Sequence, residues 1–193
     1  MGELPTARAI GWRDQQPRDS HQAEPVDRAA RRAGPDAAEA DAQNNLGIVL
    51  AGQGRLVEAA ARFQQAIRLK PDYPDAHNNL GSILEKQDKL DEAMASYQQA
   101  LRLKANFPDA HNNLGIVLWQ QGRLDEAVAC YQQALHFKPD YPEAHWNRSL
   151  VWLSMGHFEQ GWPGYEWRWK CKEFGSMPPL PSGTVLPWTG GPS

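Results

Sequence analysis

Residues 108–141 read PDAHNNLGIVLWQQGRLDEAVACYQQALHFKPDY, and nearly the same text occupies residues 74–107. A looser copy covers residues 40–73, and a degraded copy begins at Pro142. Self-similarity at a fixed period of this size is the signature of an array of stacked structural units. The sequence therefore predicts an all-α solenoid with three full 34-residue repeats and a degenerate fourth.

Small, large and turn-forming residues recur at fixed positions of the unit. Glycine at position 8 and alanine at positions 20 and 27 allow two helices to approach closely, and an aromatic ring at position 24 fills the space between them. Glycine or aspartate at position 15 separates two apolar-periodic segments and favours a left-handed backbone. Each unit is therefore predicted to be a helical hairpin. In units one to three, these residues are Gly47, Ala59, Ala66, Phe63 and Gly54; Gly81, Ala93, Ala100, Tyr97 and Asp88; and Gly115, Ala127, Ala134, Tyr131 and Gly122.

This order of residues, with Leu before the glycine and Pro71 and Pro139 at position 32, resembles the tetratricopeptide repeat (TPR) family over residues 40–169. The resemblance implies a right-handed superhelix of stacked hairpins. It also implies that the first helix of each hairpin lines a concave groove in which a peptide or partner protein binds. We therefore expect a protein–protein interaction scaffold.

The repeats divide the chain into three parts. Residues 1–35 lack apolar periodicity and are expected to be a disordered tail, because they cannot bury enough surface to offset the loss of chain entropy. Residues 174–193 are rich in Pro, Gly and Ser and are expected to be a linker or tail. The TPR domain between them covers residues 36–173, with repeats at 40–73, 74–107 and 108–141 and a degenerate capping unit at 142–173.

Asparagines recur at positions 5 and 6, on the helix that the resemblance places in the groove. An amide offers both a donor and an acceptor, so it can pair with the backbone of an extended peptide whatever its side chains. A similar asparagine ladder is a feature of the TPR superhelix of protein O-linked N-acetylglucosamine transferases. Two interpretations are open: the ladder binds a peptide, or the amides bond within and between hairpins.

Two tryptophans fall on the same expected side of the array. Paired indoles could anchor a ligand side chain there, or Trp119 could pack on the neighbouring unit. The candidate partner-binding residues are therefore Asn44, Asn45, Asn78, Asn79, Asn112, Asn113, Trp119, Trp146 and Asn147.

Acids recur at position 2, as Asp41, Asp75, Asp109 and Glu143. They could give the groove an acidic rim that favours an extended, basic partner. They could also complement the dipole of the helix that they begin, for roughly 0.3–1 kcal/mol each. TPR domains that clamp the C-terminal carboxylate of chaperones resemble one another in having Lys at this place, so we do not expect a chaperone-tail adaptor.

Composition and spacing argue against several other functions. The net charge is −3 with both signs interspersed, which is unlike a nucleic-acid binder, and no run of apolar residues is long enough to span a membrane. Two cysteines form no disulfide framework and fit a reducing, cytoplasmic location. We find no nucleophile–base pair and no phosphate loop, so we expect neither catalysis nor a cofactor. The histidines at position 4 should lie roughly 10 Å or more apart, too far to share a metal: His77, His111 and His145.

The degenerate unit ends in a tryptophan-rich block, HFEQGWPGYEWRWKCKEF, at residues 157–174. The block and the later WTGGP at residues 188–192 resemble the junction before the catalytic domain in bacterial TPR glycosyltransferase-like proteins, although Thr189 stands where that family more often has Asp. The resemblance implies an alternative function: the substrate-recruiting arm of a glycosyltransferase whose catalytic domain is missing from this chain. If Trp162, Trp167 and Trp169 normally pack on such a domain, they form an exposed apolar patch here, and we expect self-association through it.

Overall fold

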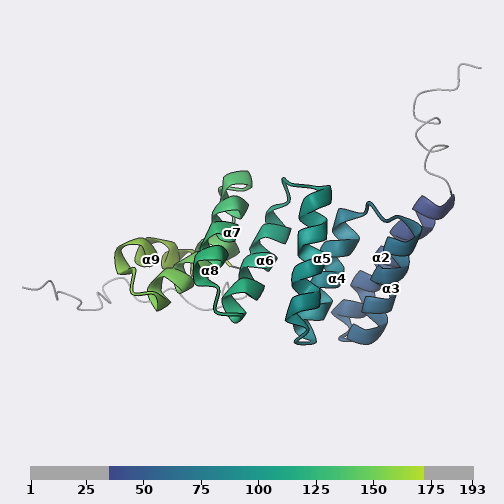
Figure 1. Ribbon diagram of the computed structural model, residues 1–193, viewed down its shortest axis with the longest axis horizontal. Coiled ribbons are helices and arrows are strands. Elements are labelled where there is room, and N and C mark those ends of the chain that lie inside the picture. The colour runs from purple at the N-terminus through teal and green to yellow at the C-terminus, as the bar shows by residue number, and fades with distance from the viewer. Residues whose placement is uncertain (1–34, 172–193) are drawn as a thin grey trace, which may run out of the picture. The chain divides into compact units, whose positions relative to one another are not determined.

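The structure, a computed structural model, describes residues 35–171, which form eight α-helices and one 3-10 helix and no strand (Figure 1). Each helix packs most closely on its hairpin partner and next on the adjoining hairpin, so the hairpins stack in chain order. The predicted all-α array of stacked hairpins is thereby confirmed. The hairpins are α2 (Pro35–Gly52) with α3 (Leu56–Leu69), α4 (Pro74–Lys86) with α5 (Leu90–Leu103), α6 (Pro108–Gln120) with α7 (Leu124–Phe137), and α8 (Pro142–Ser154) with α9 (Phe158–Tyr165), which the 3-10 helix η1 (Glu166–Lys170) follows.

The turn inside each hairpin has a left-handed residue at position 15, as predicted. The φ angles are 76° at Gly54, 61° at Asp88 and 75° at Gly122. The degenerate unit keeps the same device, because Gly156 has a φ of 79°. The predictions for the N-terminal tail and for the Pro-rich segment after the repeats fall on residues 1–34 and 172–193, outside the described residues.

Close packing inside each hairpin explains the glycine at position 8. A Cβ added to Gly81 would lie 2.7 Å from the ring of Tyr97, and one added to Gly115 would lie 2.6 Å from the ring of Tyr131. Both rings are fully buried. A side chain at position 8 and a ring at position 24 therefore compete for one space.

The degenerate unit has a different close contact between its two helices. Ser149 stands at position 8 and is fully buried, and the residue opposite it is Gly164. A Cβ added to Gly164 would lie 3.0 Å from the Cβ of Ser149. The glycine at position 23, next to Tyr165 at position 24, therefore makes room for the serine at position 8.

At each junction a histidine bonds to the preceding unit, and a lysine packs on an aromatic ring of its own unit. The Nε2 of each position-4 histidine donates to the carbonyl at position 32 of the preceding unit, at 3.0 Å from His77 to Pro71, 3.0 Å from His111 to Ala105 and 2.8 Å from His145 to Pro139. The lysine at position 31 lies over the ring at position 34 of its own unit, with Nζ–centroid distances of 4.6, 4.6 and 4.1 Å for Lys70 on Tyr73, Lys104 on Phe107 and Lys138 on Tyr141. Burial lowers the pKa of His111 and His145, so both are neutral donors near pH 7.

The first helix differs from the equivalent helices of the other units in its length. α2 has 18 residues, whereas α4, α6 and α8 have 13 each. The additional residues are at its N-terminal end, ahead of the first repeat. None of the described helices is both long and apolar enough to cross a membrane.

Candidate functional site

Three hydrogen bonds join asparagines of neighbouring hairpins. In each bond the position-6 amide of one unit donates from Nδ2 to the Oδ1 of the position-5 amide in the preceding unit. The distances are 3.0 Å from Asn79 to Asn44, 3.1 Å from Asn113 to Asn78, and 3.1 Å from Asn147 to Asn112. Side-chain hydrogen bonds between asparagines thereby link the first helix of each hairpin to the first helix of the next, as one continuous series of amides.

The adjacent asparagines at positions 5 and 6 of a unit have different surroundings. The position-5 residues Asn44, Asn78 and Asn112 are buried. Asn79 and Asn113 at position 6 are half-buried, and Asn45, ahead of which no hairpin is described, is exposed. Bonding between hairpins, one of the two interpretations of the sequence, is therefore present. Because an amide has two N–H groups and one oxygen, Asn79 and Asn113 keep further hydrogen-bonding capacity beyond these bonds.

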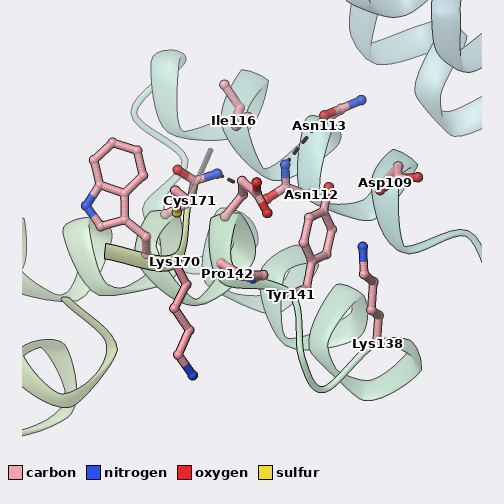
Figure 2. Close-up of a pocket in the computed structure, with 12 residues that line it drawn as sticks. Asp109, Asn112, Asn113, Ile116, Lys138, Tyr141, Pro142, Lys170 and Cys171 are labelled. Atoms are coloured by element: carbon pink, nitrogen blue, oxygen red, sulfur yellow. Dashed lines mark hydrogen bonds between the residues drawn. The ribbon is translucent and has the colours of Figure 1, made fainter. Parts of the chain in front are cut away.

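A pocket of about 650 Å³ lies at the C-terminal end of this series, between α6, α8 and η1. Figure 2 shows Asn112 within it, with Lys170 and Cys171 on one side and Asp109 and Lys138 on the other. Four of the nine predicted binding residues line it: Asn112, Asn113, Trp146 and Asn147.

Charges of both signs and an aromatic ring face the pocket. Asp109 and Glu143 bring carboxylates and Lys138 brings an ammonium group, whereas the Nζ of Lys170 lies over the ring of Trp167, which does not line the pocket. Burial, and after it the nearby carboxylate of Asp109, raises the pKa of Tyr141, so its phenol stays protonated. In the first unit, burial and Asp41 raise the pKa of Tyr73 to about 12. The acids at position 2 thus act on the tyrosines at position 34 of their own units.

The remaining predicted site residues lie elsewhere. Trp119 is half-buried and packs against the hydrophobic core, outside the pocket. Asn44, Asn45, Asn78 and Asn79 belong to the first two hairpins, farther along the same series of amides.

Sequence reasoning missed four residues that carry charged, aromatic or thiol groups to the pocket. Lys138 and Tyr141 carried a signal, since lysine and an aromatic residue recur three apart at every junction. Cys171 and Lys170 carried none, because they follow the last hairpin and have no equivalent in the other units. Cys171 is buried and its Sγ lies 3.6 Å from the carbonyl oxygen of Trp167.

Rings and cations of the tryptophan-rich block stack on one another. Trp167 stacks on His145 with centroids 3.9 Å apart and planes 13° apart, and the Nζ of Lys170 lies 3.9 Å from the Trp167 centroid. The guanidinium of Arg168 lies 4.3 Å from the Trp169 ring, and both Trp167 and Trp169 are half-buried. Of the three tryptophans considered for an apolar patch, Trp162 is the exposed one.

A family model described as TPR repeat matches residues 49–88, 86–122 and 117–156, which together span more than half of the chain. The chain belongs to the TPR repeat family. It matches none of the curated proteins with which it was compared.

Solved structures with the same fold include the crystal structure of MamA, at 21% identity and a TM-score of 0.63 over 74% of this chain and 82% of MamA. The first TPR of Spaghetti, bound to the HSP90 peptide SRMEEVD, matches at 20% identity and a TM-score of 0.61 over 62% of this chain and 95% of that one. An O-GlcNAc transferase mutant of Thermobaculum terrenum matches at 23% identity and a TM-score of 0.59, over 61% of this chain and 23% of the transferase. Such similarity establishes the fold.

The described residues contain no cluster of three or more His, Cys, Asp or Glu side chains that could hold a metal ion.

Proposed function

We propose that this protein is an interaction scaffold that binds an extended peptide along the helices α2, α4, α6 and α8, with the pocket at the α6–α8 end as the main anchoring point. The observation that carries the proposal is that Asn112, Asn113, Trp146 and Asn147, chosen from the sequence and its resemblance to the TPR family, line one pocket of about 650 Å³. A pocket of that size accommodates one or two peptide side chains with the backbone between them.

Amides along the groove suit recognition of a peptide backbone. Asn79 and Asn113 each donate one N–H to an asparagine of the preceding hairpin. The remaining N–H and oxygen can pair with the C=O and N–H of an extended chain, which would make binding tolerant of the peptide's sequence. The bonds between hairpins hold these amides in place before the peptide arrives, and this lowers the entropy cost of binding.

The charges refine the expected partner. Asp109 and Glu143 favour a basic side chain, as the acids at position 2 predict, while Lys138 adds positive charge at the same pocket. We expect basic residues in the peptide together with at least one acidic or neutral residue at this end. The structure of Spaghetti with an HSP90 peptide shares the fold, but the acids that begin these helices argue against a C-terminal carboxylate ligand here.

A peptide array probed with the full chain tests the proposal. Binders should be lost or weakened at least about tenfold by Trp146→Ala and by the double variant Asn79→Ala/Asn113→Ala, in proteins whose circular dichroism and melting show that the fold is intact. Gln98→Ala is the control, because Gln98 is an exposed amide on α5, outside the helices along which the peptide is proposed to bind. Binding that is unaffected by Trp146→Ala and by the double variant would refute the proposal that the peptide binds in this groove.

A second candidate, the substrate-recruiting arm of a glycosyltransferase, is favoured by the exposed Phe158 and Trp162 on α9. Those side chains would pack on a catalytic domain. The nucleotide sequence downstream of Ser193 tests the idea, since a reading frame for a transferase domain is required.

We also propose that the chain acts by binding and not by catalysis, in a reducing compartment such as the cytoplasm. The purified chain should not hydrolyse sugar nucleotides, and a fluorescent fusion should report the compartment.

A further inference from the structure

The outer face of α2 is a repeat surface that no described hairpin covers. Position 10 shows the contrast: Val49 is 55% exposed, whereas Ile83, Val117 and Val151 are 2%, 0% and 0% exposed. Position 7 repeats it, since Leu46 is 42% exposed and Leu80 and Leu114 are 8% exposed each. The side chains that each later unit buries against the preceding hairpin are therefore open to solvent in the first unit.

Asn45 belongs to this face and is the first member of the amide series. Asn79, Asn113 and Asn147 each donate to an amide of the preceding unit. Asn45 occupies the same position and is exposed. A molecule that covers the face can therefore also receive a hydrogen bond from Asn45.

The face runs along α2 as a stripe of small and apolar residues. Ala38, Ala42, Asn45, Leu46 and Val49 follow one another at spacings of four, three, one and three residues, which places them on one side of a helix. The 18-residue α2 is about 27 Å long, so the stripe extends past the part of the helix that pairs with α3. Two exposed acids border the stripe: Glu39, seven residues before Leu46, and Asp41, four residues before Asn45.

We propose that this face binds the same face of a second copy, as an antiparallel α2–α2 pair about a two-fold axis between Asn45 and Leu46. That register places Ala42 of one copy opposite Val49 of the other, so a small residue meets a large one on both sides of the axis. It also brings the two Asn45 amides together, and amides are self-complementary donors and acceptors.

Charge complementarity favours this occupant. The same register brings Asp36, in the first turn of α2, near Arg55 of the second copy, which follows the end of α2. Both residues are exposed. The Nε and one terminal nitrogen of Arg55 already bond to Glu58 of the same copy, so Asp36 would share this guanidinium with Glu58. An isologous interface doubles each such contact, because residue i meets j and j meets i.

The C-terminal end of a second copy is the poorer occupant. In an internal junction the acceptor for the position-6 amide is a position-5 asparagine. The last unit has Trp146 at position 5. Head-to-tail stacking would therefore leave Asn45 without its amide acceptor.

The size of the face sets the strength of the dimer. The stripe from Ala38 to Val49 is about 18 Å long and about 10 Å wide, so it covers roughly 180 Å² on each copy, which is far below the range of stable dimers and at the bottom of that of transient ones. We expect a reversible dimer with a dissociation constant in the micromolar range or weaker.

Sedimentation velocity of the full chain over a concentration series tests the proposal. A monomer–dimer equilibrium is expected, and Val49→Asp should weaken it at least about tenfold, because it buries two carboxylates in the pair. Val57→Asp is the matched control: Val57 is 78% exposed on α3, away from the stripe, and its substitution should leave the equilibrium unchanged. All these side chains are exposed, so the variants should fold.

Oxidative cross-linking tests the register. Asn45→Cys should give a covalent dimer in non-reducing gels, since the new thiols lie beside the two-fold axis, whereas Val57→Cys and the wild-type chain should not. A monomer at the highest concentration reached would overturn the proposal. So would a dimer that Trp162→Asp abolishes and Val49→Asp leaves intact, because the tryptophan-rich block would then carry the self-association. Peptide binding in the groove is measured separately and would survive either result.

Discussion

Tyr97 and Tyr131 occupy the same position in adjacent repeats, but their hydroxyl groups have different partners. Tyr97 donates from Oη to Glu85 Oε2 at 3.0 Å. The Oη of Tyr131 is buried and has no hydrogen-bond partner within residues 35–171. The difference follows from position 12, where the second unit has Glu85 and the third has Trp119.

We predict that Tyr97→Phe and Tyr131→Phe change stability by different amounts. Tyr97→Phe should lower the free energy of unfolding by about 1–2 kcal/mol, because it leaves a half-buried carboxyl without its donor. Tyr131→Phe removes a hydroxyl that makes no bond and should be neutral or slightly stabilising. Urea unfolding of the two variants measures the difference, and equal losses would contradict it.

The buried histidines predict how stability depends on pH. Burial lowers the pKa of His111 and His145 in the folded chain, and each Nε2 donates to a backbone carbonyl. As the pH falls below about 6.5, the unfolded chain binds protons that the folded chain resists, so stability decreases. The contribution is fully present above that pH.

The free energy of unfolding should therefore fall between about pH 7 and pH 5, as the histidines of the unfolded chain take up protons. His111→Gln keeps a donor for the carbonyl of Ala105 but does not titrate, so its stability should depend less steeply on pH in that window. Unfolding titrations at several pH values test this. A variant with the same slope as the wild type would show that His111 does not contribute.

For single residues, the sequence reveals the residue types but not which side chains form hydrogen bonds with each other. The sequence showed that asparagines recur at positions 5 and 6, and hydrogen bonding between them was one of two interpretations. The donor and acceptor of each bond are 35 residues apart, in different units. A pattern read within one unit cannot show such a bond.

Among the structural elements, the turn of the second hairpin has the least favourable residue at its left-handed position. Asp88 has a φ of 61°, and the other left-handed positions within residues 35–171 have glycine. For a residue with a Cβ, this left-handed conformation is unfavourable by about 1 kcal/mol or more.

Asp88→Gly should therefore raise the free energy of unfolding by roughly 0.5–1 kcal/mol. Thermal melting of the full chain measures the change. Gly122→Asp, the reverse exchange in the next hairpin, should cost a similar amount. A loss of stability in Asp88→Gly would mean that the aspartate side chain stabilises the turn by another route.

The hairpins were predictable because their rules are local. Position 15 needs a left-handed residue, and position 8 must be small if position 24 carries a ring. The close contact between Ser149 and Gly164 was not predictable, because it depends on how two helices pack together. The wall that η1 adds to the pocket was also not predictable, since residues 166–170 have no counterpart in the repeats.

In the described part of the molecule, stability should vary along the array. Internal hairpins bury both of their faces, whereas α2 leaves Leu46 and Val49 exposed and α9 leaves Phe158 and Trp162 exposed. In a stacked array each unit is stabilised mainly by its neighbours, so the ends have less support than the middle.

Amide hydrogen exchange should therefore be slowest in α4 to α7 and faster in α2 and α9. Mass spectrometry of the full chain at low concentration measures this, and at higher concentration the proposed pairing should slow exchange in α2. Uniform protection from α2 to α9 would mean that the array unfolds as one cooperative unit.

The asparagine bonds also bear on how such a chain can lengthen in evolution. Every internal unit carries an acceptor for its successor and a donor for its predecessor, so a duplicated unit fits between any two existing ones. The last unit keeps the donor, Asn147, but has Trp146 in the acceptor's place. Copy number can therefore grow inside the array, whereas growth beyond α9 would first require the loss of Trp146.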